Sequence, residues 1–187
     1  FGIMNRRDIL LAGSAGIVGG LATPAITQAV VAKSQDPRVI LFIDFLNAYK
    51  ATPDSVFPGK AYFQQYVSDD FSYVTTAGKR LAVDELISRA KLYADSFGNA
   101  NANLKSAVMV SDGAWLIKTL TPFTFAKEFR GFPASKRSAD IEAIWEVSFD
   151  ANGKISSMRR HGDYSALAAV VGTNDLCRLH QLDEPLA

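Results

Sequence analysis

Residues 138–163 read S-A-D-I-E-A-I-W-E-V-S-F-D-A-N-G-K-I-S-S-M-R-R-H-G-D, and they decide the fold. Apolar and polar residues alternate through residues 138–149, which is the period-two pattern of a half-buried strand. Residues 150–153 have the composition of a turn, because Asn and Gly tolerate the positive φ of a tight reversal. Residues 154–163 then form the return strand. The sequence therefore predicts a β-hairpin with one apolar face and a charged end.

The chain before this hairpin contains amphipathic helices followed by strands. We expect Asp69 and Asp70 to end the second helix, and Gly98 to close the third. Gly172 is expected to cap a last, short helix. The expected helices cover residues 37–51, 61–67, 83–97 and 164–171, and the expected strands before the hairpin cover residues 71–75, 106–110 and 114–125. This order predicts one α+β domain whose strands form an antiparallel meander.

Composition limits the function of that domain. The chain has 187 residues, 48% of them hydrophobic and 21% charged, which suffices for one sizeable core. The formal net charge of +1 gives no electrostatic reason to expect a nucleic-acid partner. Cys177 is the only cysteine, so an intramolecular disulfide and a thiolate metal site are excluded. The two histidines have no carboxylate at ligand spacing and no glycine-rich phosphate loop is present, so we expect no metal and no cofactor.

Residues 1–32 have the layout of an export signal rather than of a folded core. Arg6 and Arg7 precede an uncharged run over residues 9–32, and the arginine pair followed by Ile and two Leu resembles a bacterial twin-arginine (Tat) signal. Residues 27–29 or 30–32 would serve as the small-residue cleavage site. This resemblance implies a periplasmic location for the domain that follows.

The same apolar run could also be retained as a membrane anchor. Its 24 residues, at about 1.5 Å per residue in a helix, could cross a hydrocarbon core of about 30 Å. Ala12, Gly16 and Gly20 repeat every four residues, which would let another membrane helix pack closely on that face. Tat-type signals are also simply rich in Gly and Ala, so cleaved signal and retained anchor both stay open.

Several segments of the domain resemble the SnoaL-like branch of the nuclear transport factor 2-like superfamily. They are residues 63–71, residues 78–87, residues 128–136 (E-F-R-G-F-P-A-S-K), and the run Asn152-Gly153-Lys154-Ile155 with the later Asp163 and Gly172. The segments occur in the order of that branch, and the resemblance as a whole covers about residues 38–172. The resemblance implies a cone-shaped, curved antiparallel sheet packed on two or three helices.

The branch includes polyketide cyclases, and in them the aspartate that matches Asp163 acts as general acid/base. Three positions depart from the pattern of the branch. Arg159 stands where the branch has a tryptophan, Ser157 where it has a glutamate, and Val170 where it has a glutamine. These departures weaken the transfer of cyclase activity to this chain.

Arg159, His161 and Asp163 share one face of the expected return strand. Asp163 is the candidate general acid/base and His161 its candidate helper, whereas the alternative is a solvated strand end with a surface ion pair. Simple pairing across the turn puts all three on the face of Asp140 and Glu142 and not on that of Trp145, and a bulge or one-residue slip would reverse this. The candidate lining of a ligand pocket consists of Tyr49, Tyr73, Trp115 and Arg159, although the aromatic residues also suit a core.

Two functional hypotheses follow for the folded domain of residues 33–172, with residues 173–187 as a tail. The first is a non-catalytic periplasmic accessory subunit that its retained signal helix, residues 9–32, holds against a membrane protein complex and lipid. The small-residue face of that helix and the three departures from the branch favour it. The alternative is a soluble periplasmic cyclase-like lyase or isomerase that uses Asp163 on a small apolar carbonyl compound.

Overall fold

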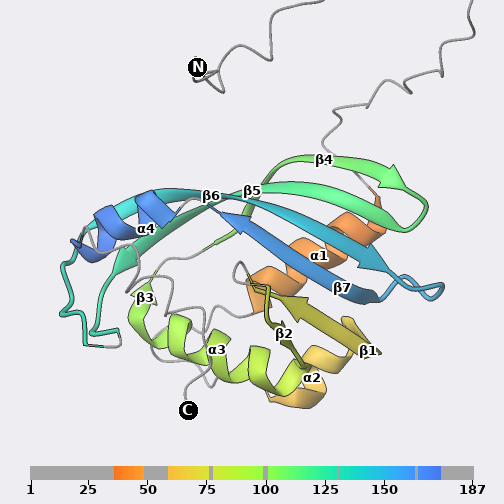
Figure 1. The fold of residues 1–187 in the computed structure, drawn as a ribbon, viewed down its shortest axis with the longest axis horizontal. Helices are drawn as coiled ribbons and strands as arrows, with labels where there is room; N and C mark the ends of the chain where they lie inside the picture. Colours follow the sequence, from red (N-terminus) through yellow and green to blue (C-terminus); the bar gives the residue numbers. More distant parts are fainter. Residues whose placement is uncertain are drawn as a thin grey trace, which may run out of the picture.

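The computed structural model describes residues 36–48, 59–75, 78–98, 101–129, 131–162 and 164–173. Four helices and seven strands occur in this part of the chain (Figure 1). In chain order they are α1 (Pro37–Ala48), α2 (Lys60–Gln64), β1 (Val67–Val74), β2 (Arg80–Leu81), α3 (Val83–Ser96), β3 (Phe97–Gly98), β4 (Asn103–Ser111), β5 (Ala114–Phe125), β6 (Ser138–Phe149), β7 (Ile155–Gly162) and α4 (Tyr164–Val171). The predicted order of helices and strands is confirmed, and β5, β6 and α4 have the predicted bounds.

The strands form one sheet in the order β2-β1-β7-β6-β5-β3, and β4 pairs with β5 beside β3. The prediction of a wholly antiparallel sheet is wrong at one place, because β1 and β7 run parallel. A parallel neighbour requires a long crossover, and the chain between β1 and β7 supplies it, since it contains α3 and all the other strands. The α+β class is confirmed, with a mixed sheet.

The structure confirms the predicted β6–β7 hairpin. The Asp150 carboxylate accepts hydrogen bonds from the backbone N–H groups of Asn152 and Lys154, each at 2.9 Å, and Gly153 has a φ of +78°. A register shift between Ser148 and Phe149 places a bulge at the start of the return strand. Beyond the bulge, Arg159 and His161 face the same side of the sheet as Glu146, which is the side that simple pairing across the turn predicts.

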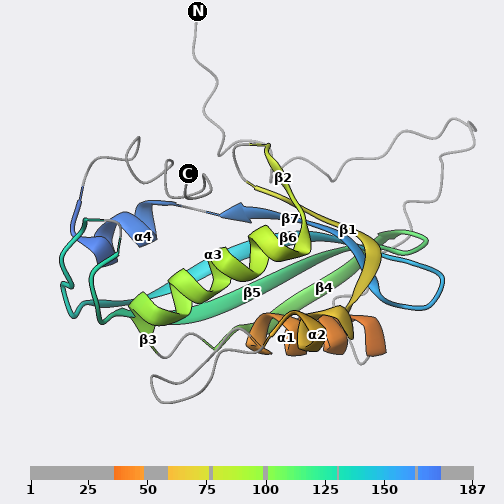
Figure 2. The ribbon, with the colours of Figure 1, turned by 90° about the horizontal axis from the view of Figure 1, so that it is seen from below.

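This register determines which residues lie on the inner face of the sheet and which lie on the outer face. Figure 1 shows the sheet bending over α1 and α3, and Figure 2 shows these helices from below against its inner face. Buried residues of β5 and β6 alternate with exposed ones, so that Ile117, Thr119, Ala143 and Val147 face inward while the residues between them face outward. The inner face thus carries the core, and the outer face of β6 is charged.

Two clusters of buried apolar side chains make up this core. The first joins α1, α2, β1 and one end of β5–β7 and is built on Phe42, Phe45, Phe63, Ile117, Val147 and Ile155. The second joins β3, α4 and the other end of β5 and β6, and is built on Phe97, Phe125, Phe129, Phe132, Ile141, Leu167 and Val170. The inner face between the two clusters carries polar side chains. This part of the sheet is therefore the candidate for a functional site.

Two predicted boundaries are wrong for identifiable reasons. Asp69 and Asp70 do not end a helix but lie exposed inside β1, where a register shift against β7 lets both carboxylates reach solvent. The third helix ends at Ser96 because Phe97 adopts an extended conformation, φ −115° and ψ 111°, and Gly98 pairs with Thr124 instead of capping the helix.

No helix in the described residues is long and apolar enough to cross a membrane. The predicted signal or anchor, residues 1–32, with its packing residues Ala12, Gly16 and Gly20, lies outside the described residues.

Candidate functional site

The centre of the inner face is built from one buried and two half-buried polar side chains. Thr119 of β5 is only 1% exposed, although its side chain is polar. The indole Nε1–H of Trp145 in β6 donates a hydrogen bond to the Thr119 hydroxyl oxygen over 3.0 Å. The Trp145 ring meets the Phe42 ring of α1 edge-on, with 5.6 Å between the ring centroids. The helix and the hydrogen bond together hold the indole in place while leaving part of it accessible.

Arg160 of β7 lies on this indole. Its guanidinium carbon is 6.0 Å from the centre of the Trp145 ring, within the range of a cation–π contact. The position is available because residue 162 is glycine: a Cβ built there would lie 3.0 Å from the Arg160 guanidinium carbon and 3.1 Å from Nη2. Trp145 and Arg160 are direct partners across the β6–β7 pair, so the hairpin register itself brings them together.

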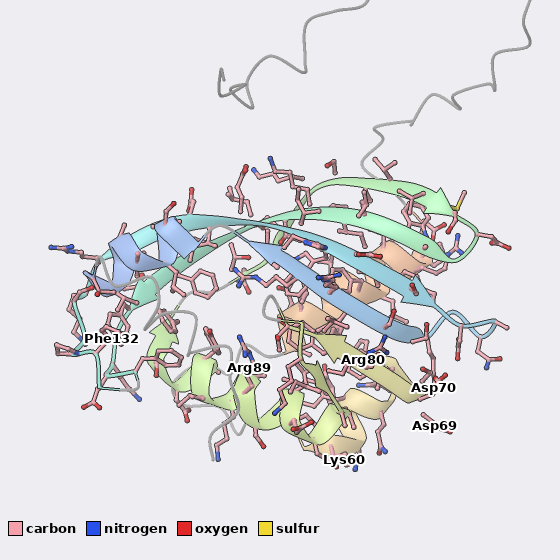
Figure 3. The ribbon with its side chains drawn as sticks, in the orientation of Figure 1. Lys60, Asp69, Asp70, Arg80, Arg89 and Phe132 are labelled. Atoms are coloured by element: carbon pink, nitrogen blue, oxygen red, sulfur yellow. The ribbon has the colours of Figure 1, made fainter. Side chains whose placement is uncertain are left out.

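A second arginine, Arg89, approaches the same region from α3. Its guanidinium carbon is 5.3 Å from the Tyr93 ring centre and 6.0 Å from the Tyr73 ring centre. Tyr73 pairs with Met158 in β7, two residues before Arg160 on the same face of the strand. Figure 3 shows Arg89 directed from α3 toward the inner side of the sheet. Two guanidinium groups therefore face the inner surface from opposite elements.

Aromatic rings continue from Tyr93 into the second apolar cluster. The Tyr93 ring is 4.9 Å from that of Phe129 and 5.6 Å from that of Phe97, and Phe97 meets Phe123 at 5.7 Å. Tyr93 and Phe123 stay half-buried, so their rings are accessible where Phe97 and Phe129 are not. We call Arg89, Tyr93, Thr119, Trp145 and Arg160 the inner site.

The inner site suits one kind of chemistry. Half-buried aromatic rings offer flat apolar surface, and guanidinium groups bind carbonyl, enolate or carboxylate oxygen through several N–H donors. Within the described residues, no group of three or more His, Cys, Asp or Glu side chains is arranged to hold a metal ion. The arrangement fits an organic molecule that combines a flat apolar part with an oxygen function.

The residues that the sequence proposed for catalysis lie elsewhere or outside the described chain. Arg159 and His161 are exposed on the outer face, opposite Glu146 and Ile144. His161 Nε2 is 3.6 Å from a Glu146 carboxylate oxygen, which is a surface contact. Asp163 lies outside the described residues. The predicted face for Arg159 and His161 is therefore observed, and the structure does not bring these two side chains to the inner site.

Two of the four residues predicted to line a pocket have defined positions on the inner side. Tyr73 is 4% exposed and contacts Arg89, at the margin of the inner site. Trp115 is 7% exposed in the first apolar cluster, with the Arg38 guanidinium carbon 5.4 Å from its ring centre. Tyr49 lies outside the described residues. Ligand contact by these residues stays a prediction.

No sequence pattern marks the five residues of the inner site as a group: Arg89, Tyr93, Thr119, Trp145 and Arg160. The sequence does contain one indication of the site. The alternation that turns Arg159 outward also turns Arg160 inward, next to Trp145. Arg89 follows the apolar positions Leu86 and Ile87 in α3, so its direction depends on how the helix packs. That packing is tertiary information.

Tyr66, which follows α2, has a raised pKa. The hydroxyl oxygens of Tyr62 and Tyr66 are 3.2 Å apart. This hydrogen bond, followed by partial burial and nearby negative charge, raises the pKa of Tyr66 to about 12. At the start of α1, Arg38 binds the Asp36 carboxylate at 2.9 Å and lowers the pKa of that carboxyl group. Both pairs are peripheral and provide probes of the native structure.

No protein-family model and no curated protein matches this chain. Solved structures do match. AclR from Streptomyces galilaeus, a proposed hydroxylase, superimposes with a TM-score of 0.60 and 14% identity, over 74% of this chain and 83% of AclR. A proposed SnoaL-like polyketide cyclase from Jannaschia sp. CCS1 gives 0.57 and 11% identity, over 75% and 97% of the two chains. IdmH from Streptomyces antibioticus, a proposed polyketide cyclase, gives 0.59 and 14%, over 73% and 99%.

At such low identity a structural match establishes fold and not activity. The matches nevertheless cover nearly the whole length of the two cyclase-like proteins, so the described domain is a complete counterpart of theirs. The chain therefore has the α+β fold that SnoaL-like polyketide cyclases share, which is the nuclear transport factor 2-like fold.

Proposed function

We propose that this domain binds a small, largely apolar carbonyl compound at the inner site and moves a proton on it, as a cyclase-like isomerase or lyase. The observation that carries the proposal is the accessible Trp145–Arg160 pair between two apolar clusters. Structural likeness to proteins described as polyketide cyclases supports the same choice. A purely structural inner face would be expected to be apolar throughout, because buried polar groups cost free energy.

The proposed chemistry is removal of a proton from the carbon next to a carbonyl group. A base takes the proton, and the electron pair of the C–H bond moves onto the carbonyl oxygen to give an enolate. Arg160 and Arg89 would stabilise that developing negative charge through N–H donors. The base would be Asp163. Because β7 ends at Gly162, the strand alternation that turns Arg159 and His161 outward does not extend to this residue. Return of the proton to a different carbon of a conjugated enolate completes an isomerisation. Attack of the enolate carbon on a second carbonyl group, whose oxygen then takes the proton from the base, completes a cyclisation.

Deuterium exchange on 2-tetralone tests this proposal, because the ketone has an aromatic ring and acidic protons beside its carbonyl. In deuterium oxide the protein should accelerate the loss of the C1 proton signal in the NMR spectrum. Asp163→Asn should abolish the acceleration. Lys118→Met is the matched control, since Lys118 pairs with Glu142 on the outer face at 2.9 Å, and it should leave the rate unchanged.

Two results would contradict the proposed chemistry. One is a wild-type rate equal to that of buffer, and the other is an Asp163→Asn rate equal to that of the wild type. Unfolding curves measured on the Asp163→Asn variant distinguish a lost rate from a lost fold.

The first hypothesis from the sequence, an anchored accessory subunit, depends on residues 1–32. Those residues lie outside the described part of the chain, and the solved neighbours favour the small-molecule hypothesis. An anchor and an inner site are compatible, so anchoring at the periplasmic face of a membrane complex remains a proposal of its own.

A further inference from the structure

We propose that the outer face of the sheet is an interface between two copies of this chain, related by a two-fold axis that runs along the strands between β6 and β7. This surface lies on the opposite side of the sheet from the inner site, so the proposal goes beyond the proposed function. In such a dimer the two inner faces point away from each other, and both inner sites stay open.

The outer face has no covering layer within the described part of the chain. All four described helices contribute side chains to the two apolar clusters of the inner face. Two large apolar residues are nevertheless exposed on the outer face: Leu116 of β5 is 39% exposed and Ile144 of β6 is 45% exposed. Burying them against a partner would favour association in proportion to the apolar area removed from water.

One row of residues across the outer face indicates which partner fits. Direct cross-strand pairs connect β1, β7, β6, β5 and β4, so that the row reads Val74, Arg159, Glu146, Leu116 and Val108. Its centre holds one cation beside one anion, and apolar side chains lie on both sides of this pair. A row of this composition is complementary to itself when it is reversed.

A two-fold axis between Arg159 and Glu146 produces this reversal. It places Arg159 of each copy opposite Glu146 of the other, and it brings the apolar part of the row on one side of the axis against the apolar part on the other. In the next row it places His161 opposite Ile144, since these two residues are also direct partners across β6 and β7. Such reciprocal contacts are what two-fold symmetry requires. Packed sheets keep their strand directions within about 30°, so this register applies to the strands beside the axis.

Charge argues against an axis along β6 itself. That axis would set Glu146 against Glu146 and Glu142 against Glu142 of the other copy, and like charges placed in contact oppose association. Arg159, by contrast, is available for a contact between copies. It is exposed and has no ion-pair partner among the described residues, although Glu146 is its direct cross-strand neighbour. Glu146 is exposed too, and its contact with His161 is long, at 3.6 Å.

Charge reversal tests the interface. Sedimentation equilibrium of the full-length protein in a mild detergent should show a monomer–dimer equilibrium. Glu146→Arg sets two cations against each other across the axis, and Arg159→Glu sets two anions against each other. Either variant alone should raise the dissociation constant of the dimer at least about tenfold, because like charges then meet at the interface. Asp140→Arg is the matched control, since it reverses an exposed carboxylate of β6 far from the axis, and it should leave the constant nearly unchanged.

Mixing the two reversed variants shows that the contact joins two chains. In a mixed pair, the Glu146→Arg copy contributes two cations and the Arg159→Glu copy contributes two anions, so only opposite charges meet across the axis. An equimolar mixture should therefore associate about as tightly as the wild type, although neither variant does so alone. A repaired contact within one chain cannot produce this result.

Three results would overturn the proposal. They are a wild-type chain that stays monomeric at every concentration, a dimer that neither reversal weakens, and a mixture that does not restore association. Circular dichroism on each variant shows whether it is folded, so that a lost dimer is not confused with a lost fold. Deuterium exchange on 2-tetralone should be the same for Glu146→Arg as for the wild type, which tests the inner site separately from the interface.

Discussion

The Trp145 indole donates its hydrogen bond diagonally across the sheet, to the hydroxyl of Thr119 at 3.0 Å. The direct partner of Trp145 on β5 is Ile117, and that of Thr119 on β6 is Ala143. Because Ala143 is small, the indole can lie along the inner face and reach the threonine. This bond orients the aromatic surface on which Arg160 rests, and so it links the fold to the inner site.

Replacing Thr119 by valine removes the acceptor and keeps the shape of the side chain. We expect Thr119→Val to lower the free energy of unfolding by about 1 kcal/mol, because the half-buried indole N–H loses its partner. Urea denaturation followed by tryptophan fluorescence measures this. Thr124→Val is the control, since the Thr124 hydroxyl bonds to the exposed Ser138 hydroxyl at 2.8 Å and should cost less. Equal losses in the two variants would argue against a special role for Thr119.

Gly162 is predicted to matter for binding rather than for stability. In Gly162→Ala the new methyl group would come within 3.0 Å of the Arg160 guanidinium carbon, so the arginine must move off the indole. The clash involves the end of a flexible side chain, and alanine also lowers the entropy of the unfolded chain, so unfolding free energy should change by less than about 1 kcal/mol. Affinity for 2-tetralone should fall, because Arg160 no longer lies beside the Trp145 indole. A variant that binds this ketone like the wild type would show that Arg160 does not act from this position.

Tyr66 provides a prediction about pH. Its pKa is raised from 10.0 to about 12, so the native state holds the phenol proton more tightly than the unfolded chain does. The resulting stability is complete below about pH 10 and is lost as pH rises toward about 12. Tyr62→Phe removes the first cause, the hydroxyl partner, and should lower the Tyr66 pKa. Ultraviolet difference titration, with Tyr66→Phe to assign the signal, measures this; an unchanged midpoint in Tyr62→Phe would refute the assignment.

The N-terminal segment provides a prediction independent of the site. If residues 9–32 act as a retained anchor, protein extracted from native membranes should have the intact mass of a chain that begins at Met4 or earlier. A cleaved Tat signal would instead give a chain that begins at Val30 or Lys33 in the soluble periplasmic fraction. Mass spectrometry of both fractions distinguishes the two fates, and the shorter chain would contradict the anchor.

The sequence predicted the hairpin and the helices because their signals are local. Alternation over β6, the Asp-Ala-Asn-Gly turn and the apolar face of α3 each depend on residues close together in the chain. Ends of elements were less predictable. Asp69 and Asp70 suggest a stop, yet β1 accommodates them because a bulge faces them to solvent, and that requires knowing that β7 lies alongside.

The inner site was only half predictable for the same reason. Strand alternation alone puts Arg160 on the side of Trp145 and Arg159 on the opposite side. The sequence does not say that Arg89, on a helix more than sixty positions earlier in the chain, faces the same surface. Parallel pairing of β1 with β7 brings Tyr73, and with it Arg89, to this place. The resemblance to SnoaL-like proteins predicted the fold correctly and pointed to Asp163, which lies outside the described residues.

The central claim, that a small molecule binds on the inner face beside Trp145, has one direct measurement. The chain has two tryptophans, so a ¹⁵N-labelled sample gives two indole N–H signals, which Trp145→Phe assigns. Titration with N-phenyl-1-naphthylamine should shift the Trp145 signal and leave that of Trp115 nearly unchanged, because Trp115 is buried in the first apolar cluster. Saturation by the ligand with no shift of the Trp145 signal, or with a larger shift of the Trp115 signal, would contradict the claim.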